Sequence, residues 1–327
     1  MADSSSGRVA EPKATQGEIK KHSFLVGSLI RLVKERPLGT VGGVITLVLL
    51  FIAIFCDFLA PYGMNECWVG DFLTPPSAGF WFGTDNVGRD ILSRVIFGAR
   101  VSVIVGLGGA TLATTISVII GVVSGYIGGK FDLTVQRFVD AWMCIPGLIF
   151  MMIVMSIIGG SIWNLILVMG LSHGVCSSRL IRGAVIGIKE NVYVQAAVAI
   201  GCSTPRLVLR HIMPNIMAPT LILFTHRVPS VILGEASLSF LGFGIPPPFP
   251  SWGGMLSGMG RSYMFQAPWM VIWPGLALAS VVYGVNMFGD ALRDLLDPRL
   301  RGGAGRYGVR KGKSKKGGKA NQSSTTE

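Results

Sequence analysis

Long apolar runs without a charged residue constrain this chain more than any other feature of its sequence. Residues 141–178 hold no Asp, Glu, Lys or Arg, and residues 101–127 form a second charge-free run rich in glycine and β-branched residues. A helix crosses the hydrocarbon core of a bilayer with roughly 20 mostly apolar residues. Because backbone N–H and C=O groups cannot be left unpaired in lipid, these runs predict membrane-spanning α-helices.

The composition of the whole chain agrees with a membrane protein. Only 14% of the residues are charged, against about a quarter in soluble domains. The run at residues 141–178 is too long for one span, and we expect it to break at Gly159-Gly160. We therefore predict an all-α integral membrane protein with a transmembrane domain at residues 41–292. Its six expected spans cover residues 41–60, 101–127, 138–158, 161–180, 216–241 and 268–291.

The distribution of Lys and Arg predicts the orientation in the plasma (inner) membrane. With the N-terminus inside, the outer segments carry only Arg89, Arg94, Arg100 and Arg261. Nearly all other cationic residues then face the cytoplasm, as the positive-inside rule requires. We expect both termini to be cytoplasmic.

The two ends of the chain predict segments on the inner membrane surface. Residues 1–40 form an expected cytoplasmic arm in which "HSFLVGSLIRLVKERP" mixes apolar and basic residues, as interfacial helices do. Residues 293–327 are basic and glycine-rich, which predicts a disordered tail that binds anionic lipid rather than nucleic acid. The tryptophans of the outer segments, among them Trp252, Trp269 and Trp273, are expected to anchor at the membrane interface, with docking of a partner by these loops as the alternative.

A patterned segment separates the fourth and fifth spans, within residues 190–215. The sequence "YVQAAVAIGCSTPRLVLRHIMPN" predicts two short helices joined by a turn at Gly201, with Thr204 as the N-cap of the second helix. The alanines give the first helix a narrow face that another protein can approach closely. This segment is either a docking site inside the cell or an ordinary amphipathic elbow on the membrane surface.

The same segment resembles the EAA loop of ABC-transporter permeases. That motif has Glu-Ala-Ala, three residues, Gly, nine residues, and a hydrophobic-x-Leu-Pro ending, and this chain departs from it where Gln195, His211 and Met213 stand. In that family the loop lies in a groove of a cytoplasmic ATPase. The resemblance implies this coupling role for Gln195, Ala196, Ala197, Gly201, Arg210, His211 and Pro214.

Further segments narrow the resemblance to one branch of the family. They are "FGTDNVGRDILSRVIFGAR", "SGYIGGKFD", "GEASLSFLGFG", "PSWGGML", "GDALRDLLDPRLR" and the ending "RHIMPN". In this order they resemble the C-type permease of dipeptide, oligopeptide or nickel importers. The resemblance implies a type I ABC importer fold that translocates short peptides, with nickel chelates or another small solute as the alternative. It also implies three kinds of partner: a second permease subunit, two cytoplasmic ABC ATPases and an extracytoplasmic solute-binding protein.

The chain itself lacks the residues of an ATPase or a metal site. A P-loop needs a glycine five positions before Gly312-Lys313-Ser314, where Tyr307 stands instead. The five cysteines are scattered without a CxxC pair, so neither a zinc site nor a disulfide framework is expected. We expect no cofactor on this chain, with ATP and Mg²⁺ held by the partner ATPases.

Polar residues inside the spans are candidates for the translocation path, because ionisable groups in a bilayer are costly and usually functional. The candidates are Arg227, Glu235 and Asn286. Arg227 is expected to face the cavity and attract a carboxylate of the solute. The alternatives are an ion pair with a neighbouring subunit or a side chain that reaches the membrane surface.

Two other classes of function are suggested less strongly by the sequence. "GLSHG" at residues 170–174 matches G-x-S-x-G, with Ser172 beside His173, as in a serine hydrolase. That chemistry requires a strand–turn–helix context, whereas this segment is an apolar helical run. A self-sufficient ion-coupled carrier would need a buried acid network that the sequence does not suggest, and would leave the patterned segment unexplained.

Overall fold

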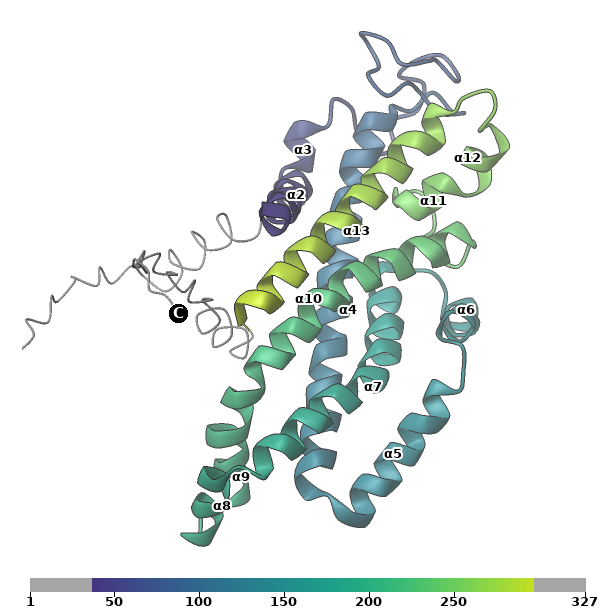
Figure 1. The fold of residues 1–327 in the computed structure, drawn as a ribbon. Coiled ribbons are helices and arrows are strands. Elements are labelled where there is room, and N and C mark those ends of the chain that lie inside the picture. The colour runs from purple at the N-terminus through teal and green to yellow at the C-terminus, as the bar shows by residue number, and fades with distance from the viewer. Residues whose placement is uncertain (1–36, 297–327) are drawn as a thin grey trace, which may run out of the picture.

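The computed structural model describes residues 37–296, and there every regular element is a helix. Figure 1 shows an elongated bundle around α4. The elements are α2 (Pro37–Ile54), α3 (Cys56–Leu59), α4 (Ile91–Ile127), α5 (Gly129–Met143), α6 (Gly147–Ile158), α7 (Ile162–Lys189), α8 (Val192–Ala199), α9 (Thr204–Leu207), the π-helical turn η1 (Val208–Ile212), α10 (Met213–Phe240), α11 (Trp252–Leu256), α12 (Gly258–Ser262) and α13 (Trp269–Leu296).

Five helical segments are long and apolar enough to cross a membrane, which confirms an all-α membrane protein. They are α2, α4, α7, the continuous segment from α9 to the end of α10, and α13. The pair α5 and α6 meets the same criterion only when taken together, with a bend of 82° between them. The described residues therefore hold five or six spans.

Several helices differ in extent from the predicted spans. α4 begins ten residues before the predicted residue 101, because the Asp90 side chain caps it by accepting a hydrogen bond from the Ser93 N–H at 2.8 Å. The predicted span at residues 138–158 is split at Pro146, which stands as the N-cap of α6. α13 continues past residue 293 to Leu296, into the predicted tail. The amphipathic segment before α2 and the rest of that tail lie outside the described residues.

The charge-free run is interrupted between α6 and α7 by a cap. The Ser161 hydroxyl accepts a hydrogen bond from the Asn164 N–H at 3.1 Å, which starts α7. The Asn164 amide donates in turn to the carbonyls of Ile158 and Gly159, at 3.1 and 3.0 Å. These bonds satisfy the terminal groups of both helices at one corner.

The closest helix pair, α4 and α7, packs through glycines. A Cβ on Gly170 would stand 2.5 Å from the Leu112 side chain, and one on Gly121 would stand 2.7 Å from the backbone oxygen of Ser178. Larger residues at either position would push the helices apart. The same pair carries much of the buried core, so α4 and α7 form the centre of the bundle.

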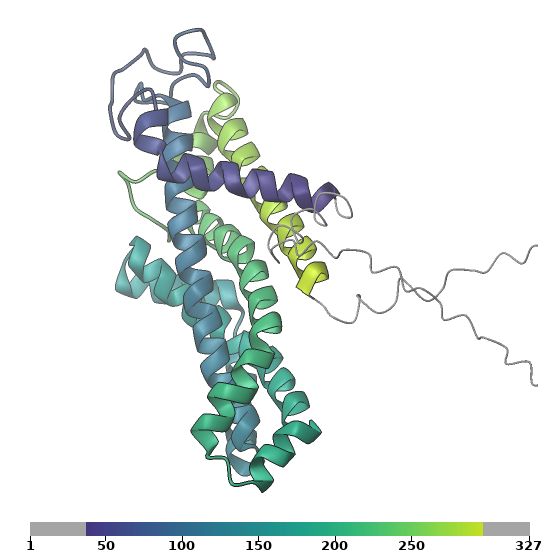
Figure 2. The ribbon, with the colours of Figure 1, turned by 90° about the vertical axis from the view of Figure 1, so that its left-hand side faces the viewer.

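The two ends of the bundle have different structures. α8 and α9 form one end, and the loops around α11 and α12 form the other, with α4 running between them (Figure 1). Figure 2 shows α2 crossing α4 at a steep angle. At the loop end, Trp252 is 2% exposed and donates its indole N–H to the Val95 carbonyl at 3.0 Å. The expectation of an interface anchor was therefore wrong for Trp252, which is a core residue.

Candidate functional site

The patterned segment folds as a helix, a turn and a second helix. Gly201 has a φ of +81°, a conformation that glycine adopts without strain, and it follows Ile200, the C-cap of α8. The next helix begins at Thr204, with Ser203 as its N-cap, so Thr204 is one residue inside the helix rather than its cap. The second helix continues through η1 into α10 and is not a separate element.

The inner side of this segment is anchored to the bundle. Val194, Ala197 and Leu207 are 1%, 7% and 1% exposed, and they form one apolar cluster. Tyr126 in the last turn of α4 and Ile188 near the end of α7 pack against it. The turn is thus packed against α4 and α7, and its second helix continues into α10.

The outer side of the segment carries apolar residues that nothing in the described chain covers. Val192, Ile200 and Leu209 are 81%, 85% and 68% exposed. We call these three residues the apolar tip. Large exposed apolar side chains grouped around one turn mark a site of protein or membrane contact.

The predicted coupling residues occupy both sides of the segment. Gln195, Ala196, Gly201, Arg210 and Pro214 are exposed, whereas Ala197 belongs to the inner cluster. The Gln195 amide donates to the Glu190 carbonyl at 3.2 Å. His211 is half-buried, and its carbonyl accepts from Asn215 at 2.6 Å.

Charged groups fasten the helices that support the segment. Lys189 donates from Nζ to the Tyr126 carbonyl at 2.7 Å, and its ammonium lies 5.4 Å from the centre of the Tyr126 ring. Arg182 of α7 holds Asp132 of α5 through two hydrogen bonds. Neither contact could be predicted from the sequence, because each joins residues 50 or more positions apart.

The three candidates for the translocation path do not form one cluster. Arg227 donates to the Ser177 hydroxyl of α7, and its Nε is buried with no hydrogen-bond partner among the described residues. Glu235 is 1% exposed and accepts from the Ser239 hydroxyl at 2.6 Å. Asn286, on α13, donates to the Val282 carbonyl of its own helix at 2.8 Å.

The serine-hydrolase alternative does not fit the structure. Ser172 and His173 lie within α7, an uninterrupted helix from Ile162 to Lys189, and Ser172 is 5% exposed. Consecutive helical residues diverge by about 100°, so His173 is not directed at Ser172. No group of three or more His, Cys, Asp or Glu residues that could hold a metal ion occurs between residues 37 and 296.

Another pair of arginines lies at the opposite end of the bundle. From the sequence, Arg89 and Arg94 are predicted only to be charges of the outer segments. In the structure the Nε atoms of both approach one carboxylate oxygen of Asp85, at 2.7 and 4.0 Å. Both arginines lie in the one motif "GTDNVGRDILSR", and this short spacing was the only feature of the sequence that could have indicated that they lie close together.

Comparisons with known proteins agree with this architecture. Residues 117–302 match the family of binding-protein-dependent transport system inner membrane components, and residues 25–76 match the N-terminal transmembrane domain of oligopeptide transport permease C. A dipeptide transport permease of Alkalihalophilus pseudofirmus is 36% identical over 82% of this chain and 88% of its own length. An oligopeptide transport permease of Bacillus subtilis is also 36% identical, with the same coverage.

A probable D,D-dipeptide transport permease of Escherichia coli is 35% identical over 86% of this chain and 95% of its own length. The family model covers more than half of the chain, and these relatives align with most of it. The chain is a multi-pass inner-membrane protein and a transporter subunit rather than an enzyme. It belongs to the family of binding-protein-dependent transport system inner membrane components, the permeases of ABC importers.

Proposed function

We propose that this chain is one of two permease subunits in an ATP-driven importer of short peptides. The peptide class is inferred from the relatives, whose names specify dipeptides and oligopeptides. A nickel chelate or another small solute on the same scaffold is the alternative. The single observation that carries the transport mechanism is the apolar tip, exposed above a buried and anchored base.

The apolar tip has the properties of a docking site for an ATPase subunit. Its base packs against α4 and α7 and continues into α10, so a push on the turn would be transmitted to these helices rather than absorbed by a loose loop. Gln195, Ala196, Gly201, Arg210, His211 and Pro214 would lie in or beside the contact. Ala197 would act from beneath by holding α8 in place.

The charge distribution supports a cytoplasmic position for this end of the bundle. Cationic residues gather there, among them Lys130, Arg137, Arg179, Lys189 and Arg210. The positive-inside rule then favours cytoplasmic positions for both termini. In this orientation ATP and Mg²⁺ bind to two partner ATPases, and a solute-binding protein delivers the solute at the opposite end.

Arg227, Glu235 and Asn286 are proposed to contribute to the translocation path. Arg227 has the strongest support, because a guanidinium within a span is costly unless it is used. Its bond to Ser177 leaves donors free for a passing carboxylate. Glu235 is buried and would act by holding Ser239, whose hydroxyl donates to it.

The test is ATP hydrolysis by the complete complex in lipid discs, with its ATPases, second permease and binding protein. A mixture of short peptides, a nickel chelate and no solute are compared. We expect peptides to stimulate hydrolysis, and Gly201→Asp to abolish the stimulation because a charge is placed at the turn. Stimulation by the nickel chelate alone would replace the peptide assignment by the alternative.

The matched control is Gly159→Asp. Gly159 has a φ of +84°, close to that of Gly201, and neither glycine has another atom within 4 Å of a built Cβ. Both variants place the same charged side chain at an open glycine with a positive φ, but at different places in the bundle. Equal loss in both variants, or no association with any ATPase, would contradict the docking assignment.

A further inference from the structure

A cavity at the end of the bundle opposite α8 contains a guanidinium group that is not fully neutralised. The cavity has a volume of about 440 Å³, and a neighbouring one of about 410 Å³ shares part of its wall. Ligand pockets for small molecules fall between about 300 and 1,000 Å³. The shared wall consists of Arg89, Arg94, Pro247, Gly254, Met255 and Ser257.

The carboxylate nearest to the two arginines is largely occupied by Arg89 and the backbone. Asp85 accepts from Arg89 Nε at 2.7 Å through Oδ2. Its Oδ1 accepts from the N–H groups of Val87 and Arg89, both at 2.9 Å. The Asp85 carboxylate thus supplies one negative charge for two guanidinium groups, and most of its hydrogen-bond acceptor positions are already occupied.

Arg94 is the group left without a full partner. Its Nε lies 4.0 Å from Asp85 Oδ2, beyond hydrogen-bond distance, and its Nη1 is buried without a hydrogen-bond partner. Only 12% of the Arg94 side chain is exposed. A buried guanidinium with unused donors is costly, and that cost is removed when an anion binds.

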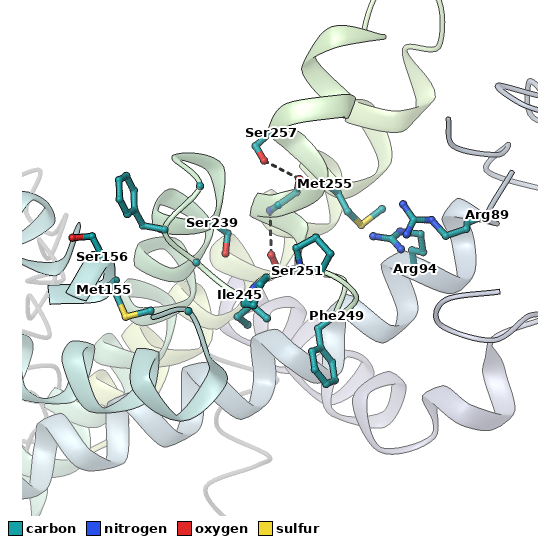
Figure 3. Close-up of a pocket in the computed structure, with 17 residues that line it drawn as sticks. Arg89, Arg94, Met155, Ser156, Ser239, Ile245, Phe249, Ser251, Met255 and Ser257 are labelled. Carbon is teal, nitrogen blue, oxygen red and sulfur yellow. Dashed lines mark hydrogen bonds between the residues drawn. The ribbon is translucent and has the colours of Figure 1, made fainter. Parts of the chain in front are cut away.

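We propose that this cavity is an entry subsite that binds the carboxylate group of the solute through Arg94. The proposal rests on the proposed function, since it names the chemical class of solute that the importer takes from its binding protein. Guanidinium groups bind carboxylates with two parallel hydrogen bonds, which orients the solute as well as attracting it. Arg89 adds positive charge beside the same point, and Figure 3 shows the two guanidinium groups next to each other near Met255.

The remaining walls suit a short solute with apolar and polar groups. Met155, Ile245 and Phe249 offer apolar surface, and Ser156 and Ser257 offer hydroxyl groups (Figure 3). These residues come from α6 and from the segments on both sides of α11, so the cavity is assembled from separate parts of the chain. Such walls accept varied side chains, while Arg94 selects for the carboxylate that all free peptides share.

The test measures how strongly a bound solute slows the chemical modification of a cysteine on the cavity wall. It uses the permease pair with its ATPases in lipid discs, and binding protein is left out. Ser257→Cys introduces a thiol at the shared wall, and its reaction with neutral methyl methanethiosulfonate is followed by mass spectrometry. We compare protection by alanylalanine and by alanylalanine amide. We expect the free acid to slow the reaction at least about fivefold, and the amide to have little effect.

In the same background, Arg94→Gln should raise the peptide concentration needed for protection about tenfold, the loss of one charge-assisted contact. Arg94→Lys should retain part of the protection, because it keeps the charge. Arg261→Gln removes an exposed arginine of α12 outside the cavity and should change nothing. The subsite is supported if alanylalanine still protects the thiol in Arg261→Gln but no longer protects it in Arg94→Gln.

Two outcomes would overturn the subsite. The first is equal protection by the acid and the amide, or protection that survives Arg94→Gln. The second is a thiol that the free peptide does not protect but that binding protein added without peptide does protect, which would assign Arg94 to an acidic side chain of that protein. Failure of the proposed function is distinguishable, since it would appear as absent peptide stimulation of ATP hydrolysis whatever the protection result.

Discussion

Arg182 of α7 donates two hydrogen bonds to the carboxylate of Asp132 of α5, at 2.6 Å from Nε to Oδ1 and 2.5 Å from Nη2 to Oδ2. This fork-shaped contact fixes the first turn of α5 to α7 just beyond the end of α4. A second ion pair, Arg179 with Asp140, joins the same two helices two turns further along. α5 is therefore held by charges where it lacks extensive apolar contact.

We predict that Asp132→Asn destabilises the complex by about 1 kcal/mol. A bidentate charged contact contributes more than this when buried, but 30% of the Arg182 side chain is exposed, so solvent weakens it. The measurement is the Tm in lipid discs, which should fall by a few degrees. The exchanged pair Asp132→Arg with Arg182→Asp should recover part of the loss, and no recovery would indicate that the charges do not interact.

Close packing of α4 on α7 predicts opposite effects for two glycine substitutions. A Cβ at Gly121 would lie 2.7 Å from the Ser178 carbonyl and 2.9 Å from the Arg182 nitrogen, so Gly121→Ala should cost about 1–3 kcal/mol. Gly183 has no atom within 4 Å of a built Cβ, so Gly183→Ala should be neutral or stabilising by up to about 1 kcal/mol. Thermal unfolding of both variants checks the sign, and a stable Gly121→Ala protein would contradict this packing.

The apolar tip should bind the ATPase through side-chain burial. Ile200→Asp is expected to weaken ATPase association at least tenfold, because burial of an isoleucine side chain contributes about 1.5–3 kcal/mol. Phe265→Asp is the control, since Phe265 is 90% exposed at the other end of the bundle. Co-purification and titration with the ATPase measure the effect, and unchanged affinity in Ile200→Asp would remove the tip from the contact.

Arg227 should discriminate between solutes by charge. Arg227→Met is expected to reduce transport of anionic peptides several-fold more than that of neutral peptides, because only the former lose an electrostatic partner. Ser177→Ala removes the described partner of Arg227 and should leave this discrimination in place. Uptake into proteoliposomes gives the ratio, and an equal loss for both peptide classes would indicate a purely structural role.

Hydropathy alone was sufficient to predict the helical membrane fold, and the broad positions of most spans followed from it. It could not predict the 82° bend between α5 and α6, although Pro146 marked the place. It also missed the early start of α4, because residues 91–100 contain two arginines that lower the local hydropathy. Capping by Asp90 decides that start, and it depends on a single side chain.

The turn at Gly201 was predicted from residue pattern, since glycine and proline act locally. The partners of Arg227 and Arg94 were not, because Ser177 lies 50 residues from Arg227 and the cavity around Arg94 is assembled from distant segments. The sequence shows that a charged residue occurs in a span or a loop. Only the fold shows which groups already neutralise it.

α4 spans 37 residues, about 55 Å of continuous helix. Its first turn carries Arg94, and its last turn carries Tyr126 in the cluster beneath α8. A solute at the proposed subsite and an ATPase at the proposed docking site would therefore act on opposite ends of one helix, for which a tilt of 5° displaces the far end by about 5 Å. Thermodynamic linkage then makes the effect reciprocal: by whatever factor the bound solute strengthens ATPase docking, docking strengthens retention of the solute.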